Sequence, residues 1–133
     1  MAGYLPSESK AYLLSLLATQ GRYVGLAVDI DSTLGPNIIL ANITEPATPG
    51  YGRAGVTWGA PVTDLSGTVS ISNSADVNFP VVTADLDPCT YAFVTDAASG
   101  TNGRVYYVWT LTEPVTTLAG KPTKAPAGGL IIE

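Results

Sequence analysis

Two pairs of aspartates are the residues whose type and spacing come nearest to a chemical site. Asp29 and Asp31 form one i, i+2 pair and Asp85 and Asp87 form another, each at a predicted junction between a strand and a loop. Carboxylates from two loops can bind Ca²⁺, or serve as the acid and base of a glycosidase. Aspartates at such junctions more commonly shape turns by accepting backbone hydrogen bonds, and no EF-hand spacing is present. We therefore predict no metal site, no catalytic pair and no cofactor.

Histidine is absent from the sequence. This absence removes the commonest general base and metal ligand, and with them Ser–His–Asp and Cys–His catalytic groups and ordinary zinc sites. The single cysteine, Cys89, follows Pro88, precedes a strand-like run and has no basic residue close in sequence. It is expected to be a buried apolar side chain rather than a reactive thiol. No glycine-rich phosphate loop is present. These observations predict that the protein is not an enzyme.

The aromatic side chains are the remaining candidates for ligand contact. Rings in alternating strands usually enter a core, although a group of them could form a sugar-binding platform. In the doublet Tyr106-Tyr107, alternation puts one ring on each face of the strand, so one of the two is expected to meet solvent or a partner. The candidate rings are Tyr23, Tyr51, Tyr91, Tyr106, Tyr107, Trp58 and Trp109.

The composition excludes several classes of protein. The net charge is −5, from eleven acidic and six basic residues, and the basic residues are scattered, so no nucleic acid is expected as a partner. No apolar run is long enough to cross a membrane, and the N-terminus lacks the basic start of a signal peptide, so we expect synthesis in a cytoplasm. Charged residues make up only 13% of the chain, which leaves much neutral surface for contact with other proteins.

A length of 133 residues predicts one domain, which begins with a helix over residues 7–20. Ser7 is a suitable N-cap, and Gly21 is suited to the position just past the last turn. The helix is apolar on more than one side, so it could contact the core, a neighbouring subunit or both. One face carries Leu13, Leu16, Leu17 and Gln20, whereas Tyr12 and Leu14 lie towards other faces.

Residues 22–112 predict a β core. Alternating apolar residues and turn signals predict strands at 22–28, 53–58, 69–71, 77–82, 91–95 and 104–112, the last two forming a hairpin. Pro80 favours an edge or a bulge. Residues 29–37 and 42–52 are expected to be loops, the second extended and unpaired. In the last strand one face is expected to carry Val105, Tyr107, Trp109 and Leu111.

Residues 113–133 predict a Pro/Gly-rich C-terminal arm that ends in a short strand at 130–132. Several short strands separated by turn residues indicate a mainly β fold. We expect a compact antiparallel β-sandwich or small barrel with one N-terminal α-helix.

The order of these features resembles small virion proteins of tailed bacteriophages, described as tail-fibre-like or head-decoration-like. A helix and the strand at 22–29 come first, and the block GYGRAGVTWGAP at 50–61 is similar to the family's GYARQAVTWSAP block. Asn73 with VNFPVVT at 77–83 and the hairpin block AFVTDAASG at 92–100 follow, and segments 115–120 and 130–132 close the pattern. The first strand lacks the family's histidine, and the segment before Tyr91 lacks its usual tryptophan.

The resemblance implies a structural protein of the virion. The main expectation is a capsid decoration, or cement, protein: a homotrimer that binds the major capsid protein on the outer surface of the head and stabilises it. The alternative is a tail-associated or tail-fibre-type protein that contacts the host through exposed aromatics and the loop at 41–52. A third hypothesis, a carbohydrate hydrolase or calcium-dependent lectin-like module, would need the aspartate pairs.

Attachment in the first two hypotheses depends on buried apolar area rather than on chemistry. The N-terminal helix, the loop at 41–52 and the arm at 113–128 are the expected contact regions, the arm because unpaired backbone groups are available to a neighbour. The expected protein-contact residues are Leu13, Leu14, Leu17, Tyr51, Tyr106, Pro114 and Pro122.

Overall fold

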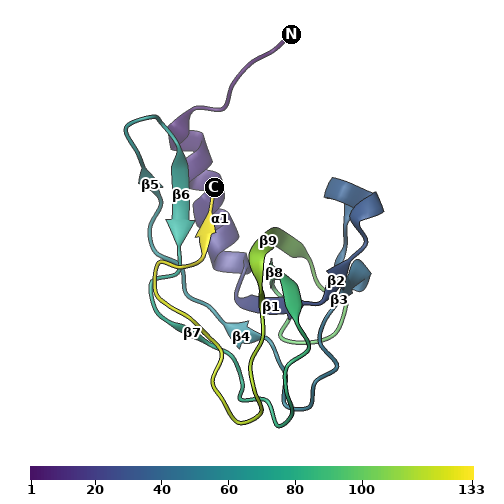
Figure 1. The fold of residues 1–133 in the computed structure, drawn as a ribbon. Coiled ribbons are helices and arrows are strands. Elements are labelled where there is room, and N and C mark those ends of the chain that lie inside the picture. Colours follow the sequence, from purple (N-terminus) through teal and green to yellow (C-terminus); the bar gives the residue numbers. More distant parts are fainter.

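A computed structural model describes residues 1–133 as one α-helix beside several short antiparallel sheets (Figure 1). The elements, in chain order, are α1 (Ser7–Gln20), β1 (Tyr23–Ala27), β2 (Asp29–Ile30), the 3₁₀ helices η1 (Ser32–Asn37) and η2 (Leu40–Asn42), β3 (Ile43–Thr44), β4 (Ala54–Gly55), β5 (Val62–Thr63), β6 (Val69–Ser72), β7 (Val77–Asn78), β8 (Cys89–Thr95), β9 (Val105–Val115), β10 (Lys124–Ala125) and β11 (Ile131–Ile132). The predicted mainly β fold with one N-terminal helix is confirmed.

The largest sheet has the strand order β4-β1-β8-β9, and all of its pairs are antiparallel. β1 lies in its interior and pairs with β8 from Tyr23↔Thr95 to Ala27↔Tyr91. Both faces of β1 are covered, and Gly25 lies so close to the Phe93 ring that a Cβ there would overlap the ring. The predicted hairpin is present as the β8–β9 pair.

The remaining strands form three smaller sheets, with the orders β11-β6-β5, β10-β7 and β2-β3. The expectation of an unpaired segment at 42–52 is wrong, because β3 pairs with β2 through Asp29↔Thr44 and Ile30↔Ile43. The strand expected at 77–82 is reduced to β7, which ends two residues before Pro80, since proline has no N–H to donate to a ladder. The strand expected at 53–58 is similarly reduced to β4.

α1 begins one residue earlier than a Ser7 N-cap requires. Pro6 occupies the N-cap position, and the Ser7 hydroxyl donates to the carbonyl of Gly67 at 3.2 Å, so the predicted Ser7 cap is wrong. Gly21 is the C-cap, and its N–H donates to Leu17 O at 2.7 Å. Its φ is −79°, so a left-handed backbone is not the reason for glycine. A Cβ there would lie 2.6 Å from Val94 Cγ1, so close packing against β8 requires the glycine.

The structure shows which side of α1 meets the core, a question that the sequence pattern left open. Leu14, Leu17 and Ala18 pack against the core, whereas Leu13 and Leu16 are about half exposed. Of the face that carries Leu13, Leu16, Leu17 and Gln20, only Leu17 packs on the first cluster. Apolar residues surround the helix almost evenly, so periodicity could not identify the side that meets the sheets.

Three buried clusters form the core. The first lies between α1 and the sheets and contains Val24, Ala54, Ile71, Val77, Val94 and Ile132. The second contains Leu26, Val82, Leu86, Cys89 and Ala92, and the third contains Ala27, Leu40, Ile43 and Phe93.

A β-bulge at Tyr106 changes the faces of β9. Thr95 pairs with Val105 but Val94 pairs with Tyr107, so Tyr106 is the extra residue. Val105 consequently packs on the third cluster, whereas Tyr106 and Tyr107 both pack on the first. Two expectations are wrong for this reason: that Val105 shares a face with Tyr107, and that the tyrosine doublet places one ring on each face.

The C-terminal arm is joined to the body along its length. β10 pairs with β7, and β11 pairs with β6. Before β10, the N–H of Leu86 donates to Thr117 O at 2.7 Å and the N–H of Phe79 donates to Thr123 O at 3.0 Å. Many backbone groups of the arm are therefore used within the chain.

Candidate interaction surface

One aspartate of each i, i+2 pair accepts a hydrogen bond from a backbone N–H. Asp31 Oδ1 accepts the Thr33 N–H at 3.2 Å and the Thr33 hydroxyl at 2.5 Å, which is the predicted turn role. Asp85 Oδ1 accepts the N–H of Ala119 at 2.9 Å and so joins its loop to the C-terminal arm. No group of three or more His, Cys, Asp or Glu residues is placed to hold a metal ion.

Cys89 is fully buried, as predicted. Its Sγ donates to the carbonyl of Asp87 at 3.2 Å. Burial, together with the nearby Asp87 charge, raises the pKa of the thiol to about 11. The side chain is therefore a neutral thiol at physiological pH and not a nucleophile.

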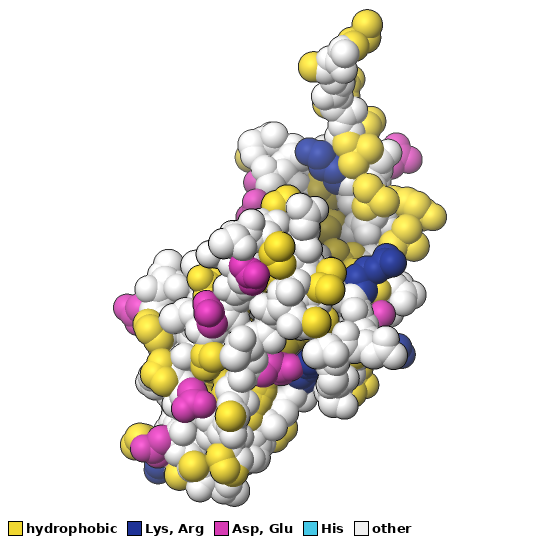
Figure 2. Space-filling view, turned by 90° about the vertical axis from the view of Figure 1, so that its right-hand side faces the viewer, with side chains coloured by type: hydrophobic (Ala, Val, Ile, Leu, Met, Phe, Trp, Pro, Cys, Tyr) yellow, Lys and Arg dark blue, Asp and Glu magenta, His cyan; other side chains and the backbone are white.

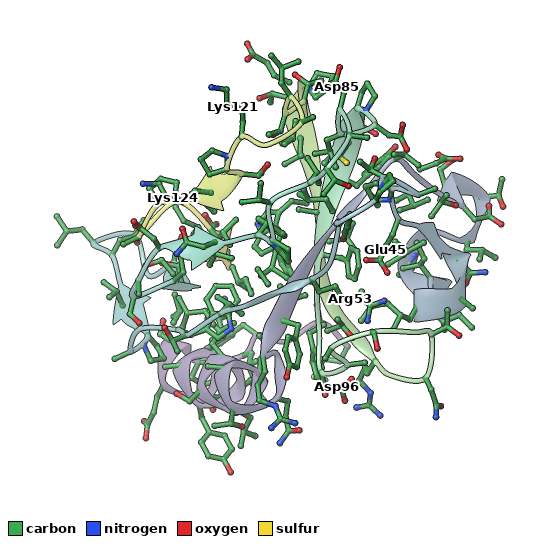
Figure 3. All side chains as sticks on the ribbon, turned by 90° about the horizontal axis from the view of Figure 1, so that it is seen from below. Glu45, Arg53, Asp85, Asp96, Lys121 and Lys124 are labelled. Carbon is green, nitrogen blue, oxygen red and sulfur yellow. The ribbon has the colours of Figure 1, made fainter.

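A buried network centres on Glu45, Tyr51 and Arg53. The Arg53 side chain is only 3% exposed, and its Nη2 lies 2.6 Å from Glu45 Oε1 (Figure 3). The Tyr51 hydroxyl donates to Glu45 Oε2 at 2.7 Å and accepts the N–H of Leu26, in β1, at 2.9 Å. Burial first, and then the hydrogen bond to Glu45, raises the pKa of Tyr51 well above its usual value.

Arg53 also reaches the turn between β8 and β9. Nη1 donates to Ala97 O at 2.9 Å, Nη2 donates to Gly100 O at 2.7 Å, and the guanidinium lies 5.4 Å from the centre of the Phe93 ring. One cation thus holds two loops to the central sheet. Tyr51, expected to be a contact residue, is fixed by hydrogen bonds and does not reach outwards.

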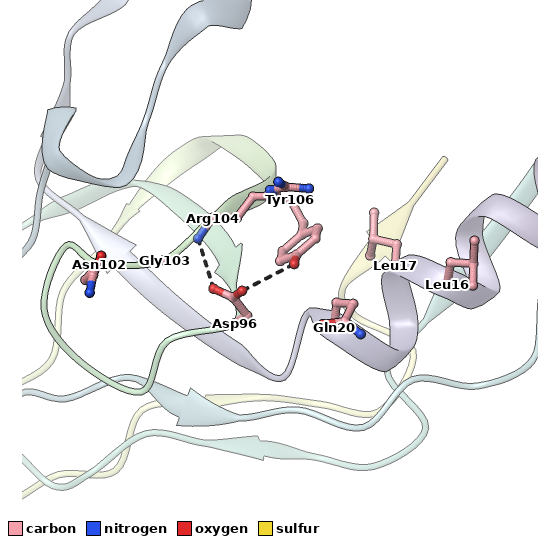
Figure 4. A pocket seen from close by; sticks show the side chains of 8 residues that line it. All are labelled: Leu16, Leu17, Gln20, Asp96, Asn102, Gly103, Arg104 and Tyr106. Carbon is pink, nitrogen blue, oxygen red and sulfur yellow. Dashed lines mark hydrogen bonds between the residues drawn. The ribbon is translucent and has the colours of Figure 1, made fainter.

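An open groove of about 750 Å³ lies between the end of α1 and the turn at 96–103 (Figure 4). Asp96 Oδ1 accepts the Arg104 N–H at 2.9 Å, and Tyr106 donates to Asp96 Oδ2 at 3.4 Å. The hydrogen bond from Arg104 lowers the pKa of Asp96. Burial, with the Asp96 charge, raises the pKa of Tyr106. Leu16 and Leu17 supply the apolar wall of the groove.

The outward side of α1 leaves several large apolar side chains uncovered. Tyr12 is 65% exposed, Leu13 50% and Leu16 47%. The N-terminal segment, residues 1–6, adds Tyr4 and Leu5, and it stands away from the body with hydrophobic side chains gathered below it (Figure 2). Scattered apolar side chains are ordinary on a surface, whereas a group of them along one helix is a candidate contact site.

The predicted contact residues fall into different environments. Leu13 is exposed on α1, whereas Leu14 and Leu17 pack on the first cluster. Tyr106 lines the groove, and Pro114 and Pro122 are exposed on β9 and the arm. The prediction did not include Tyr12 and Leu16. Their i, i+4 spacing opposite Leu14 and Ala18 is the signal that could have found them.

The Glu45–Arg53 pair was also missed. The chain has only six basic residues, and Arg53 and Glu45 lie on either side of a loop that contains proline and glycine. This spacing could have suggested an ion pair across the loop. The burial of the Arg53 side chain could not be predicted from the sequence, because it depends on the β8–β9 turn folding over it.

None of the helices is both long and apolar enough to cross a bilayer. Residues 33–133 match the model of the family described as podophage GP4 fiber I protein gp80. The match runs from η1 to the end of the chain, and α1, β1 and β2 precede it. Neither the comparison with curated proteins nor that with solved structures gives a match.

Proposed function

Because the chain belongs to the family of podophage GP4 fiber I protein gp80, we propose that it is a structural subunit of the tail-fibre apparatus of a podophage. Membership of this family makes it a structural protein of a tailed-phage particle. That the protein is located on the tail of this particle is what we propose. The observation that carries it is the match over residues 33–133, which contains three of the four strands of the central sheet and the whole C-terminal arm.

The capsid decoration role expected from the sequence receives less support than the tail role, since the family is described as a fibre protein. The homotrimer and the contact with the major capsid protein stay predictions. The tail role and the capsid decoration role share one physical basis. In both, the protein attaches through buried apolar area and no catalytic step is needed.

The internal network suits a protein that must present fixed loops. Arg53 holds the loop at 45–53 and the turn at 96–103 to the central sheet through Glu45, Ala97 and Gly100. Loops held in this way lose little conformational entropy when they meet a partner, which favours tight attachment.

Labelling of intact virions tests the proposal. Gold-conjugated antibodies against the purified chain should mark the tail region, and antibodies first absorbed with the purified chain should mark nothing. Particles from phage lacking this gene should have normal heads but lack a tail appendage. Label confined to heads would overturn the tail role and support capsid decoration, and particles without any label would contradict both.

A further inference from the structure

The turn between β8 and β9 contains the sequence Asn102-Gly103. Both residues are exposed, and both line the groove between this turn and the end of α1 (Figure 4). In any asparagine, the side-chain amide carbon lies within reach of the backbone nitrogen of the next residue. Glycine has no Cβ to obstruct that nitrogen, and its backbone is free to adopt conformations that other residues avoid. The pair therefore has the residue types for a spontaneous reaction of asparagine.

The hydrogen bonds of the backbone distinguish Asn102 from the other four asparagines of the chain. In those four, the nitrogen that would have to attack the side chain already donates a hydrogen bond, which must break before the nitrogen can react. The N–H groups concerned are those of Ile38, Ile43, Ser74 and Phe79, and they donate to the carbonyls of Gly35, Leu40, Thr57 and Thr123. The N–H of Gly103 makes no hydrogen bond.

Asn73 shows how much the fold adds to the sequence. The small Ser74 follows it, so its sequence alone would make Asn73 the nearest competitor of Asn102. Asn73 is only 2% exposed, and its Nδ2 donates to the carbonyls of Ala75 and Pro126 at 2.9 Å each. Its Oδ1 accepts the N–H of Leu130 at 2.9 Å. Its amide is therefore held by three hydrogen bonds and shielded from water.

The segment 101–103 is free to adjust, although the turn is held on both sides of it. Arg53 Nη2 donates to Gly100 O at 2.7 Å, and the Arg104 N–H donates to Asp96 Oδ1 at 2.9 Å. Between these two points, neither the backbone nor the side chains of the three residues make a hydrogen bond. The Asn102 side chain can therefore turn towards the Gly103 nitrogen without losing a contact.

We infer that Asn102 is a site of spontaneous deamidation in the folded protein. Hydroxide from the solvent removes the proton of the Gly103 N–H, and the nitrogen attacks Cγ of Asn102. A Cγ–N bond forms, the Cγ–Nδ2 bond breaks, and Nδ2 takes a proton from water and leaves as ammonia. The product is a five-membered succinimide ring. Water then opens the ring at either carbonyl carbon and leaves an aspartate or an isoaspartate at position 102.

The reaction changes the groove in two ways. Either product replaces a neutral amide with a carboxylate in a wall that already carries Asp96. Isoaspartate also adds one carbon atom to the main chain between the carbonyl of Gly100 and the N–H of Arg104, the two points at which the turn is held. The groove of an aged molecule therefore differs from that of a new one in charge and, where isoaspartate forms, in shape.

This inference does not rest on the tail role. The reaction needs only the folded chain and water, so a failure of virion labelling and a failure of deamidation are separate results.

Peptide mapping by mass spectrometry tests the site. The purified full chain is incubated under native conditions, and the conversion of each asparagine is followed over time. Asn102 should convert at least tenfold faster than any of the other four. Its rate should be higher at pH 9 than at pH 6, because the attacking nitrogen must first lose its proton. Isoaspartyl methyltransferase should label the peptide that contains position 102. An Asn102 that stays intact, or that converts no faster than Asn73, would overturn the inference.

The same incubation in denaturant separates the fold from the sequence. Asn73 should convert at least tenfold faster in the unfolded chain than in the folded chain, because unfolding removes its three hydrogen bonds. Asn102 should convert at similar rates in both. Conversion of Asn102 only in denaturant would show that the fold protects the turn, which contradicts the inference.

Asn102→Gln is the matched control variant. It keeps the amide, but the side chain is one carbon longer and would have to close a less favourable six-membered ring. Position 102 should then release ammonia at least tenfold more slowly, while the other asparagines keep their rates. The asparagine is changed rather than the glycine, because a Cβ at Gly103 would lie 2.7 Å from both Ala97 Cβ and Asp96 Oδ1. Equal ammonia release from the wild type and Asn102→Gln would place the reaction elsewhere and overturn the inference.

Discussion

The Arg53 guanidinium lies 2.6 Å from the Glu45 carboxylate in a site where the arginine side chain is only 3% exposed. A buried charge is tolerated only when it is paired and its donors are used, and Arg53 donates to Glu45, Ala97 and Gly100. The pair therefore connects parts of the chain that are far apart in sequence.

Arg53→Ala should lower the free energy of unfolding by about 1 to 3 kcal/mol, because it removes the hydrogen bonds to the partly buried Glu45 carboxylate and to the carbonyls of Ala97 and Gly100. Lys124→Ala is the matched control, since the Lys124–Asp76 pair is 3.5 Å long and about half exposed. It should cost less than about 1 kcal/mol. Urea denaturation measures both values. Equal losses in the two variants would show that the Arg53 network does not stabilise the fold.

Tyr51→Phe should lower the free energy of unfolding by about 1 to 3 kcal/mol, since it leaves the N–H of Leu26 and the Glu45 carboxylate without the hydroxyl. The loss should also depend on pH. The pKa of Tyr51 is raised in the folded protein, so the unfolded chain releases its proton first as the pH rises above 10.0, the ordinary value. The hydroxyl thus stabilises the fold fully below pH 10, and this contribution is lost at higher pH.

Denaturation measured between pH 8 and pH 11 checks the sign. Above pH 10 the stability of the wild type should fall more steeply than that of Tyr51→Phe. Tyr12→Phe, a change at an exposed tyrosine, should leave the wild-type slope unaltered. Parallel curves for the wild type and Tyr51→Phe would contradict the raised pKa.

Gly25→Ala should destabilise the protein by about 1 to 3 kcal/mol, because the new methyl group would overlap the Phe93 ring. Gly55→Ala is a close control, since Gly55 also lies in a paired strand but has nothing within 4 Å of an added Cβ. Its stability should stay within about 0.5 kcal/mol of the wild type or rise slightly. Thermal melting compares the two, and a Gly25→Ala melt equal to that of Gly55→Ala would disprove the close approach.

Cys89 should not react with a thiol reagent at pH 8 in the folded protein, since the thiol is buried and its pKa is raised to about 11. Full reaction is expected in denaturant. Following the absorbance of the released chromophore gives both rates. Rapid labelling of the folded chain would mean that the second core cluster opens readily.

The sequence predicted the elements whose signals are local. The hairpin of β8 and β9 follows from strong alternation on both sides of a turn rich in small residues, and α1 follows from a run of helix formers. The turn role of Asp31 and the burial of Cys89 follow from residue type in the same way.

Features that depend on tertiary contact were not predictable. The bulge at Tyr106 changes the face of Val105, and nothing in the local pattern indicates an extra residue there. The inward face of α1 could not be predicted because leucines occur on both sides. The short pairing of β2 with β3 was missed because Pro46, Pro49 and Gly50 dominate the segment that contains β3.

β1 lies between β4 and β8, so the middle of the largest sheet joins the beginning of the chain to residues 91–95. Pairing between such distant segments is slow, because the intervening loop must close before any contact compensates for the lost entropy. During synthesis, β1 therefore cannot pair with β8 until most of the chain has left the ribosome. A fragment limited to residues 33–133 would lack this strand and expose the edges of β4 and β8 to aggregation.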